Sequence, residues 1–223
     1  MIAVDMGIVS YFMAYPIQIE VPEFQLTDQL YEEGAIFCFD SPTSIRKLHY
    51  SWYKANRSLL HGEDQSDRRR WAHAWQLKAR KRYAHKEIEG LEADDLVAMY
   101  YDDRILTIDK DALQLPYAKL VDQNLQPWGI SRVKSKLPLV QGASFRAYQL
   151  MTGDSTDEIP RLLHTKDRTT MKQVFKQENP LLTAIELLPA GLVRASLNCL
   201  LTPTPLFFDK DPIEYVCEVY KCG

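Results

Sequence analysis

The stretch Glu92-Ala93-Asp94-Asp95 places three carboxylates within four residues, at the start of an apolar helical pattern. Carboxylates crowded this closely repel one another unless a positive charge lies among them. A hard divalent cation, which prefers oxygen ligands, is the usual partner of such a group. The stretch therefore predicts a helix whose first turn faces a metal ion.

Three short apolar runs read as buried strands, and each is followed at once by an aspartate. The runs are residues 2–4, 35–39 and 104–108, and the aspartates are Asp5, Asp40 and Asp109. Residues 117–121 fit a fourth strand, while residues 64–82 and 92–101 have the apolar spacing of helices. Strands that alternate with helices favour a parallel sheet in an α/β domain. Because ligands bind at the carboxyl edge of such sheets, the three aspartates are expected to converge there.

The composition is that of an ordinary soluble globular protein, with 46% hydrophobic and 26% charged residues. A chain of 223 residues can form one domain with a core, or one domain and a small appendage. No apolar run approaches the ~20 residues that span a bilayer, and residues 1–5 lack the basic flank of a signal peptide. The four cysteines show no CxxC spacing, which favours a reducing, cytoplasmic setting.

The charge is unevenly distributed along the chain, although the formal net charge is only −3. Ten lysines and arginines lie between Lys54 and Lys86, a strongly basic block in a mildly acidic chain. One interpretation is a solvated helix face. The position of the block between two acidic motifs favours the other, a surface that contacts nucleic acid. Within the block Trp71 and Trp75 are four residues apart, and we expect both to pack against the sheet.

Further carboxylates come from Asp111 and from the turn-like segment Gly153-Asp154-Ser155-Thr156-Asp157. With the acids named above, they make nine, and nine acids in one pocket need about two divalent ions. Two ions ~3.5–4 Å apart are the known device for in-line displacement at phosphorus. Carboxylate ligands without a histidine or cysteine cluster suit Mg²⁺ or Mn²⁺ rather than zinc.

Five motifs, in this order, resemble those of the 5′-nuclease (flap endonuclease) superfamily. They are Phe39-Asp40-Ser41 with Arg46, Tyr53-Lys54-Ala55-Asn56-Arg57, Glu92-Ala93-Asp94-Asp95, Thr107-Ile108-Asp109-Lys110-Asp111 with Leu113-Gln114-Leu115, and Gly153-Asp154-Ser155-Thr156-Asp157-Glu158-Ile159-Pro160. The resemblance runs from Met1 to about Pro160, and more loosely to about Leu206. The compact length is most similar to bacteriophage 5′→3′ exonucleases and to the 5′-nuclease domain of bacterial DNA polymerase I.

The resemblance implies a PIN-like α/β fold, with a central, mainly parallel sheet flanked by helices. The nuclease domain would comprise residues 1–144, with a helical arch at about 54–86. A mostly helical DNA-binding subdomain with a degenerate helical hairpin would follow at 145–206, and a C-terminal tail at 207–223.

The same resemblance assigns roles to the site residues. The carboxylates that would hold the catalytic metal or its waters are Asp5, Asp40, Glu92, Asp94 and Asp109. Those that would serve a second metal are Asp95, Asp111, Asp154 and Asp157. Lys54, at the base of the arch, would contact the scissile phosphate and stabilise charge on its oxygens. Arg46 and Arg57 would be supporting phosphate contacts, and Tyr53 would stack on a base.

Taken singly, each of these residues has an ordinary structural alternative. The carboxylates of Asp40, Asp109 and Asp157 fit caps of helices or turns, and Asp95 fits a first-turn helix acid. The aromatic ring of Tyr53 fits a core position, and the basic side chains near it fit surface charges. The common order and register of the five motifs favour the metal-site interpretation.

Two departures from the family pattern affect how DNA is held. No glycine lies between Gly153 and Gly191, where relatives carry a glycine-rich hairpin that binds the duplex backbone. This argues against a tight glycine turn and against the monovalent-ion site that accompanies it. Side chains would contact phosphates there instead, and the candidates are Arg161, Lys166, Arg168 and Lys172. The family's arginine shortly after the first aspartate is also missing from residues 6–33.

The function implied is a 5′→3′ exonuclease and flap endonuclease that uses two Mg²⁺ ions, with Mn²⁺ able to substitute, and leaves 5′-phosphate products. Its partner would be DNA with a free 5′ end, flap or nick, or an RNA–DNA hybrid, in replication, repair or primer removal. We expect a monomer in the cytoplasm, the host's if the source is a phage, without a membrane partner. The alternatives are a PIN-type metal-dependent ribonuclease and a non-catalytic nucleic-acid-binding relative.

Overall fold

The computed structural model describes residues 1–13, 24–58, 63–135, 137–163 and 168–220. The chain divides into two compact units. The first, called the sheet unit, comprises Met1–Thr43, Ser58–Ala112 and Ala118–Trp128. The second, called the helical unit, comprises Ser44–Arg57, Leu113–Tyr117 and Gly129–Gly223.

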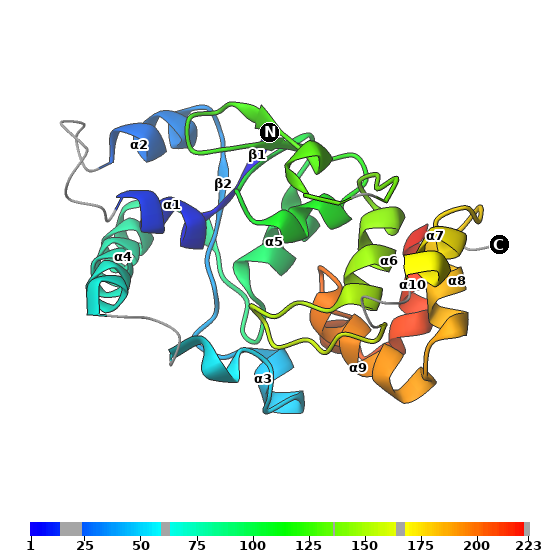
Figure 1. Cartoon of the computed structure of the whole chain (residues 1–223). Coiled ribbons are helices and arrows are strands. Elements are labelled where there is room, and N and C mark those ends of the chain that lie inside the picture. Colours follow the sequence, from blue (N-terminus) through cyan, green and yellow to red (C-terminus); the bar gives the residue numbers. More distant parts are fainter. Residues whose placement is uncertain (14–23, 59–62, 136, 164–167, 221–223) are drawn as a thin grey trace. The chain divides into compact units, whose positions relative to one another are not determined.

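One sheet organises the sheet unit (Figure 1). Its strands among the described residues are β1 (Ile2–Asp5), β2 (Ile36–Cys38), β3 (His85–Lys86), β4 (Arg104–Leu106), β5 (Lys119–Val121) and β6 (Pro127–Trp128). They lie in the order β3-β2-β1-β4-β5-β6, and only the β5–β6 pair is antiparallel. The central, mainly parallel sheet predicted from the sequence is confirmed. Two strands were not predicted, β3 and β6, each two residues long.

Four α-helices flank the strands of this unit among the described residues. They are α1 (Met6–Met13), α2 (Gln25–Glu32), α4 (Glu63–Arg82) and α5 (Ala93–Tyr100). The long helix α4 lies alongside α1 (Figure 1). Parallel strands need crossover connections of this kind, and helices are the usual form.

The buried face of α4 carries Ala72, Trp75 and Ala79, at the spacing of one helix stripe. Trp75 belongs to the core formed with the sheet and stacks on Phe24, with ring centroids 5.2 Å apart. The prediction that both tryptophans pack against the sheet is wrong for Trp71, whose exposed fraction is 60%. Trp71 lies one residue before the stripe, so the helix turns its ring outward.

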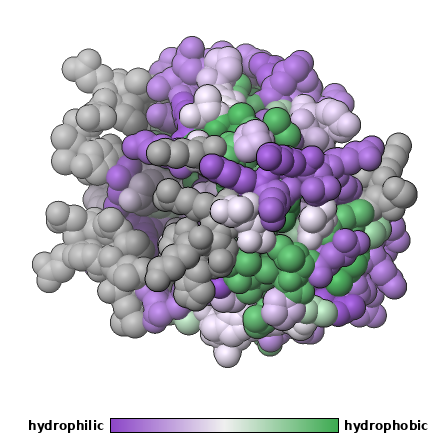
Figure 2. Space-filling model, turned by 45° about the vertical axis from the view of Figure 1, so that its right-hand side comes forward, coloured by the Kyte–Doolittle hydropathy of each residue, from purple (hydrophilic) through white to green (hydrophobic). Residues whose placement is uncertain are grey.

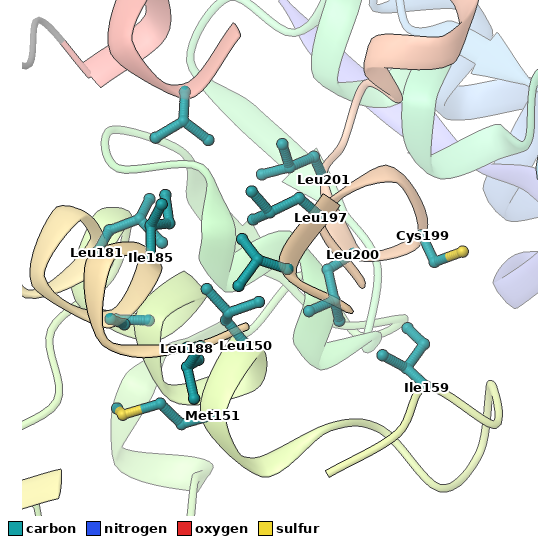
Figure 3. Packing of buried hydrophobic residues seen from close by; sticks show 14 of the residues in the cluster. Leu150, Met151, Ile159, Leu181, Ile185, Leu188, Leu197, Cys199, Leu200 and Leu201 are labelled. Carbon is teal, nitrogen blue, oxygen red and sulfur yellow. The ribbon is translucent and has the colours of Figure 1, made fainter. Parts of the chain in front are cut away.

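The helical unit packs its α-helices around a second core. These helices are α3 (Ile45–His49), α6 (Ala143–Thr152), α7 (Arg168–Val174), α8 (Pro180–Leu187), α9 (Ala190–Leu200) and α10 (Pro212–Tyr220). Leu150 of α6, Leu181 of α8 and Leu197 of α9 point toward one another in this core (Figure 3). Helix α8 begins with proline at its first position, and the Asn179 side chain accepts a hydrogen bond from the Leu182 N–H at 3.1 Å. Short 3₁₀ helices also occur, at Ala55–Ser58, Lys110–Gln114, Ile130–Arg132 and Pro205–Phe208.

The surface is largely hydrophilic on the face drawn in Figure 2, with smaller hydrophobic areas between the polar side chains. Across the described part of the chain, every helix is too short or too polar to cross a membrane. Cys38 and Cys199 are buried, Cys217 is partly buried, and Cys222 lies outside the described residues.

Candidate functional site

The sheet unit brings three predicted aspartates to one edge. Strand β1 ends at Asp5, β2 ends two residues before Asp40, and β4 ends three residues before Asp109. Because β1 pairs in parallel with both β2 and β4, all three strands end at the same side of the sheet. Asp5, on the central strand, is buried with 4% of its surface exposed, whereas Asp40 is exposed. We call Asp5, Asp40 and Asp109 the acidic edge.

Backbone N–H groups orient each carboxylate of the acidic edge. Asp5 Oδ1 accepts from the N–H groups of Gly7 at 2.9 Å and Ile8 at 3.2 Å, which caps helix α1. Asp40 Oδ1 accepts from the N–H of Ala93, the first residue of α5, at 2.7 Å. Asp109 Oδ1 accepts from the Asp111 N–H at 2.9 Å. The cap-like alternative is thus correct for these contacts, but Asp40 caps a helix that begins more than fifty residues further along the chain.

Thr107 joins Asp5 to Asp109. Its hydroxyl donates to Asp5 Oδ2 at 3.3 Å and accepts from the Asp109 N–H at 3.1 Å. The indole N–H of Trp128 donates to the Thr107 carbonyl oxygen at 2.7 Å, which fixes the backbone at this point. Thr107 was part of a quoted motif but had no predicted role, because a buried hydroxyl is not distinguished in sequence from one at the surface.

The acidic edge is electrostatically strained. Burial raises the pKa of the Asp5 carboxyl to about 7, and the negative charges of Asp40 and Asp109 add to the rise. The N–H groups of Ile8 and Gly7 oppose it. Burial also raises the pKa of the neighbouring Cys38 thiol to about 12, with a further contribution from Asp5. The Asp5 carboxyl therefore lies in a poorly solvated place beside two like charges, and a cation would relieve that repulsion.

Gly7 leaves the space in which two of these carboxylates meet. A Cβ atom at Gly7 would lie 3.1 Å from Asp5 Oδ1 and 3.6 Å from Asp40 Oδ2. Any side chain here would occupy the space between the two groups. Gly7 has no role in the sequence-based prediction, although a glycine two residues after a strand-ending aspartate is unusual inside a helix.

The chemistry of this donor set fits a hard divalent cation. Across the described residues, no three histidine, cysteine, aspartate or glutamate side chains are close enough to form a complete metal-ligand group. Mg²⁺, however, keeps several waters and is usually held by only one or two carboxylates. Asp5 and Asp40, which face each other across Gly7 with oxygen ligands alone, meet that requirement.

The stretch Glu92-Ala93-Asp94-Asp95 forms the start of helix α5, as predicted. Glu92 is the N-cap residue, and Asp95 closes a capping box in which its Oδ2 accepts from the Glu92 N–H at 3.1 Å. Asp95 is completely buried, so the structure shows it in its ordinary structural alternative. Glu92 and Asp94 are partly exposed at the same helix end.

The predicted phosphate-binding lysine lies in the helical unit, in contact with Asp157. Lys54 Nζ is 3.7 Å from Asp157 Oδ2, and both side chains are about nine-tenths buried. The Lys54 N–H also donates to the Asp157 carbonyl oxygen at 3.2 Å. Lys54 has a φ of 55°, in the left-handed region that few non-glycine residues adopt. The backbone and side chain of Lys54 are therefore both held against Asp157.

Tyr53 supports this pair from the core. Its hydroxyl donates to Asp157 Oδ2 at 3.3 Å, and its ring centroid is 4.8 Å from Lys54 Nζ. Only 2% of Tyr53 is exposed, which agrees with the core alternative rather than with base stacking.

The segment Gly153–Pro160 forms a closed turn in the same unit. Asp154 and Ile159 exchange backbone hydrogen bonds of 3.0 and 2.8 Å. Gly153 has a φ of 68°, and a Cβ there would lie 2.5 Å from the Ile159 carbonyl oxygen, so only glycine fits. Asp154 and Asp157 are both buried. Asp154 Oδ1 accepts from the Thr156 N–H at 2.9 Å.

Arg46 has a structural role in place of the predicted phosphate contact. It is 2% exposed, and its guanidinium donates to the carbonyl oxygens of Asn198 at 3.4 Å and Leu201 at 2.8 Å. These carbonyls lie at the C-terminal end of α9, where a helix favours positive charge. Among the other predicted DNA contacts, Arg57 lies in the 3₁₀ helix Ala55–Ser58, and Arg161 is exposed. Lys166 lies outside the described residues.

Among known proteins, the fold of this chain is found in solved structures of phage 5′-exonucleases. No protein-family model matches the sequence, and no curated protein matches it significantly. Solved structures match closely: a bacteriophage T5 5′-exonuclease with bound zinc ions has a TM-score of 0.64 at 13% identity, over 98% of this chain and 93% of that one. This chain has the fold of the phage 5′-exonucleases. The resemblance predicted from the five motifs is confirmed at the level of the fold.

Two further structures of the T5 protein agree with that match. One, co-crystallised with metal ions, has a TM-score of 0.62 at 14% identity and covers 98% of this chain and 93% of its own. The other is a flap endonuclease in a pseudo-enzyme–product complex with DNA and metal ions, with a TM-score of 0.56 at 16% identity. That match covers 96% of this chain and 97% of the T5 chain.

Replacing Asp5 with asparagine should change how the stability of this 5′-nuclease fold depends on pH. The folded chain keeps a proton on Asp5 up to about pH 7, whereas the ordinary pKa is 3.8. Between these values the folded state binds the extra proton, so the free energy of unfolding falls as pH rises, by at most about 1.4 kcal/mol per pH unit. Asp5→Asn has no carboxyl to titrate at this position, so it lacks this fall in the free energy of unfolding. Its stability relative to wild type should rise through that window and be constant above it.

Urea denaturation in the presence of a chelator, at pH values below, within and above the window, measures this difference. Asp102→Asn is the matched control, because that side chain is 76% exposed in the same unit. A stability difference between Asp5→Asn and wild type that does not vary with pH would contradict the strained acidic edge.

Gly7→Ala should weaken divalent-cation binding without weakening helix α1. Alanine is favoured over glycine inside a helix by roughly 0.8–1 kcal/mol, but its Cβ would enter the space shared by Asp5 and Asp40. We expect Mn²⁺ to raise the melting temperature of the wild type, and to raise that of Gly7→Ala much less. Gly191→Ala in α9 is the control, since its Cβ would meet no described atom within 4 Å. An equal Mn²⁺-induced rise in melting temperature in wild type, Gly7→Ala and Gly191→Ala would rule out cation binding between Asp5 and Asp40.

Proposed function

We propose that the protein is a divalent-metal-dependent 5′-nuclease that hydrolyses phosphodiester bonds in DNA. One observation carries the proposal: three aspartates from parallel strands meet at the ligand-binding edge of a sheet that has the phage 5′-exonuclease fold. The raised pKa of the buried Asp5 carboxyl beside two further carboxylates supports this, because perturbed groups of this kind cluster at functional sites. The T5 relative bound to DNA and metal ions supports the choice of substrate.

The residues of the acidic edge would act together on a cation. Bound divalent ions, Mg²⁺ with Mn²⁺ as a substitute, supply Lewis-acid activation of the phosphodiester. Asp5 and Asp40 would hold the first ion, and Asp109, Glu92 and Asp94 would serve it directly or through water. Asp5 would hold the ion in its ionised form, since a ligand carboxyl must be deprotonated. Thr107 keeps the Asp5 carboxylate turned toward the edge throughout.

The second ion of the proposal rests on the family resemblance. Its ligands would include Asp111, Asp154 and Asp157, some through water. Asp95 would serve the second ion through water, because its Oδ2 closes the capping box of α5.

Lys54 would stabilise the negative charge that develops on the phosphoryl oxygens. To reach a phosphate, its ammonium group must leave Asp157 Oδ2, 3.7 Å away. The phosphate then replaces the carboxylate as the partner of Lys54, and Tyr53 remains with Asp157. Arg57, three residues on, would add a second phosphate contact.

The exposed basic residues of α4 would attract the substrate. Arg69, Arg70, Lys78 and Lys81 are all exposed on this helix, in the block that the sequence marked as basic. Positive charge of this density steers nucleic acid and makes its binding sensitive to salt. The substrate we propose is DNA with a free 5′ end, at a flap or nick, with the RNA strand of a hybrid as a second form.

A substrate panel tests the proposed function. The wild type and Asp40→Asn are incubated with 5′-labelled flap, nicked, gapped, blunt and RNA–DNA hybrid duplexes, with Mg²⁺, with Mn²⁺ or with chelator. We expect metal-dependent cleavage of flap or nicked DNA by the wild type, and DNA binding without turnover by Asp40→Asn. If no cleavage is lost on adding chelator, the proposal of a metal-dependent nuclease is refuted. Cleavage of single-stranded RNA alone would assign a PIN-type ribonuclease instead.

Lys54→Ala should slow cleavage by roughly 10²-fold, the usual effect of removing one donor to a transition-state oxygen. The cation-induced rise in melting temperature should remain, because Lys54 is not one of the proposed ligands. Single-turnover rates at saturating DNA, with melting curves beside them, separate these effects. Lys47→Ala in α3 is the control, since Lys47 is an exposed lysine of the same unit. A wild-type cleavage rate for Lys54→Ala would remove the residue from the mechanism.

A further inference from the structure

Arg80, in the last turn of α4, contacts the backbone beside one carboxylate of the acidic edge. Its Nη2 donates to the Asp40 carbonyl oxygen at 3.1 Å, and its guanidinium carbon lies 4.3 Å from the centre of the Phe39 ring. Phe39 is completely buried, so the ring is a fixed support for the guanidinium. Arg80 thus holds the main chain just where it leaves β2 and presents Asp40.

Two more contacts fix the orientation of the Arg80 guanidinium. Nε donates to Glu87 Oε2 at 2.7 Å in an ion pair, with both side chains largely shielded from solvent. Nη1 donates to Gln76 Oε1, one helical turn earlier, at 3.3 Å. Because Glu87 offsets the positive charge of Arg80, the main effect of Arg80 on the acidic edge is geometric rather than electrostatic. A planar fork with several donors suits this task, whereas a lysine cannot make all three contacts.

The contact with Gln76 continues to the second carboxylate of the edge. Gln76 Nε2 donates to Ser10 Oγ at 2.8 Å, and the buried Ser10 hydroxyl donates to the Gly7 carbonyl oxygen at 2.8 Å. The Ile8 N–H, which shares a peptide group with that carbonyl, in turn donates to Asp5 Oδ1 at 3.2 Å. These hydrogen bonds all run in one direction, from the Arg80 guanidinium to the Asp5 carboxyl, so each bond polarises the next.

From these contacts we propose that Arg80 is a positioning residue of the metal centre. It acts directly on the Asp40 backbone and, through Gln76 and Ser10, on the Gly7 turn that orients Asp5. By joining the two strand ends behind their carboxylates, it holds Asp5 and Asp40 at the separation at which both reach one divalent cation. The proposal rests on the metal centre of the proposed function, but its test needs no nuclease activity.

The test compares Mn²⁺ affinity, measured by isothermal titration calorimetry on the full chain, among Arg80→Gln, Arg80→Lys and Arg82→Gln. Arg82→Gln is a matched control: the same helix turn and the same charge change, with a guanidinium bound to Asp28 by two hydrogen bonds of 2.8 Å. Melting curves without metal record the structural cost of each change. We expect both Arg80 variants to bind Mn²⁺ at least about tenfold more weakly than wild type, and Arg82→Gln to stay within about twofold. Failure of lysine to restore affinity would show that the fork, not the charge, is needed.

Gln76→Leu provides a second variant should Arg80→Gln fold poorly. It interrupts the hydrogen-bond chain between Arg80 and Ser10 while the Arg80 contact with Asp40 remains, so its loss of affinity should be smaller but measurable. Wild-type Mn²⁺ affinity in the Arg80 variants overturns the proposal, and so does an equal loss in Arg82→Gln or a wild type that binds no Mn²⁺. Weakened Mn²⁺ binding in a protein that cleaves no nucleic acid would support the positioning role and refute the nuclease. Wild-type DNA cleavage and wild-type Mn²⁺ affinity in Arg80→Gln would support the nuclease and refute the positioning role of Arg80.

Discussion

Repulsion among the carboxylates of Asp5, Asp40 and Asp109 is the constraint around which the sheet unit is built. Burial of Asp5 makes that repulsion expensive, as its pKa near 7 shows. Backbone N–H groups at the starts of α1 and α5 and in the turn after β4 donate hydrogen bonds to the three carboxylates and partly offset this repulsion. Helix starts are suited to this, because their first N–H groups have no partner within the helix and carry partial positive charge. Two helices of the unit thus begin where they do because a carboxylate receives their ends.

In the helical unit, by contrast, each buried cationic side chain contacts a negatively charged or electronegative partner. Lys54 lies against Asp157, and Arg46 donates to the carbonyl oxygens at the end of α9. Arg146, also buried, donates to the Thr202 carbonyl oxygen at 3.1 Å just beyond that helix. These contacts offset part of the cost of removing the charges from water. At the acidic edge the neighbouring charges are of the same sign, so a bound cation would relieve repulsion there.

The sequence predicted the features that depend on local pattern. Apolar runs that end on an aspartate marked β1, β2 and β4, and the carboxylate cluster at Glu92 marked the start of α5. Strands β3 and β6 were not predicted, because a two-residue strand has no periodicity to detect. Each is defined by its pairing with a neighbouring strand, β3 with β2 and β6 with β5. Tertiary contacts explain the other differences. A basic side chain such as Arg46 is the same in sequence whether it meets a phosphate or a helix end, and the roles of Gly7 and Arg80 depend on segments distant in the chain.

The strand order of the sheet also bears on how the protein folds. The aspartates of the edge come from three segments far apart in sequence, and their strands pair directly with β1 at the centre. Contacts of such long sequence separation form late and slowly, because loop closure must precede them. A cation that needs both Asp5 and Asp40 has little to bind until β1 and β2 are paired. The stabilising effect of such a cation would be slower unfolding rather than faster folding, so that metal content would set the lifetime of the native state.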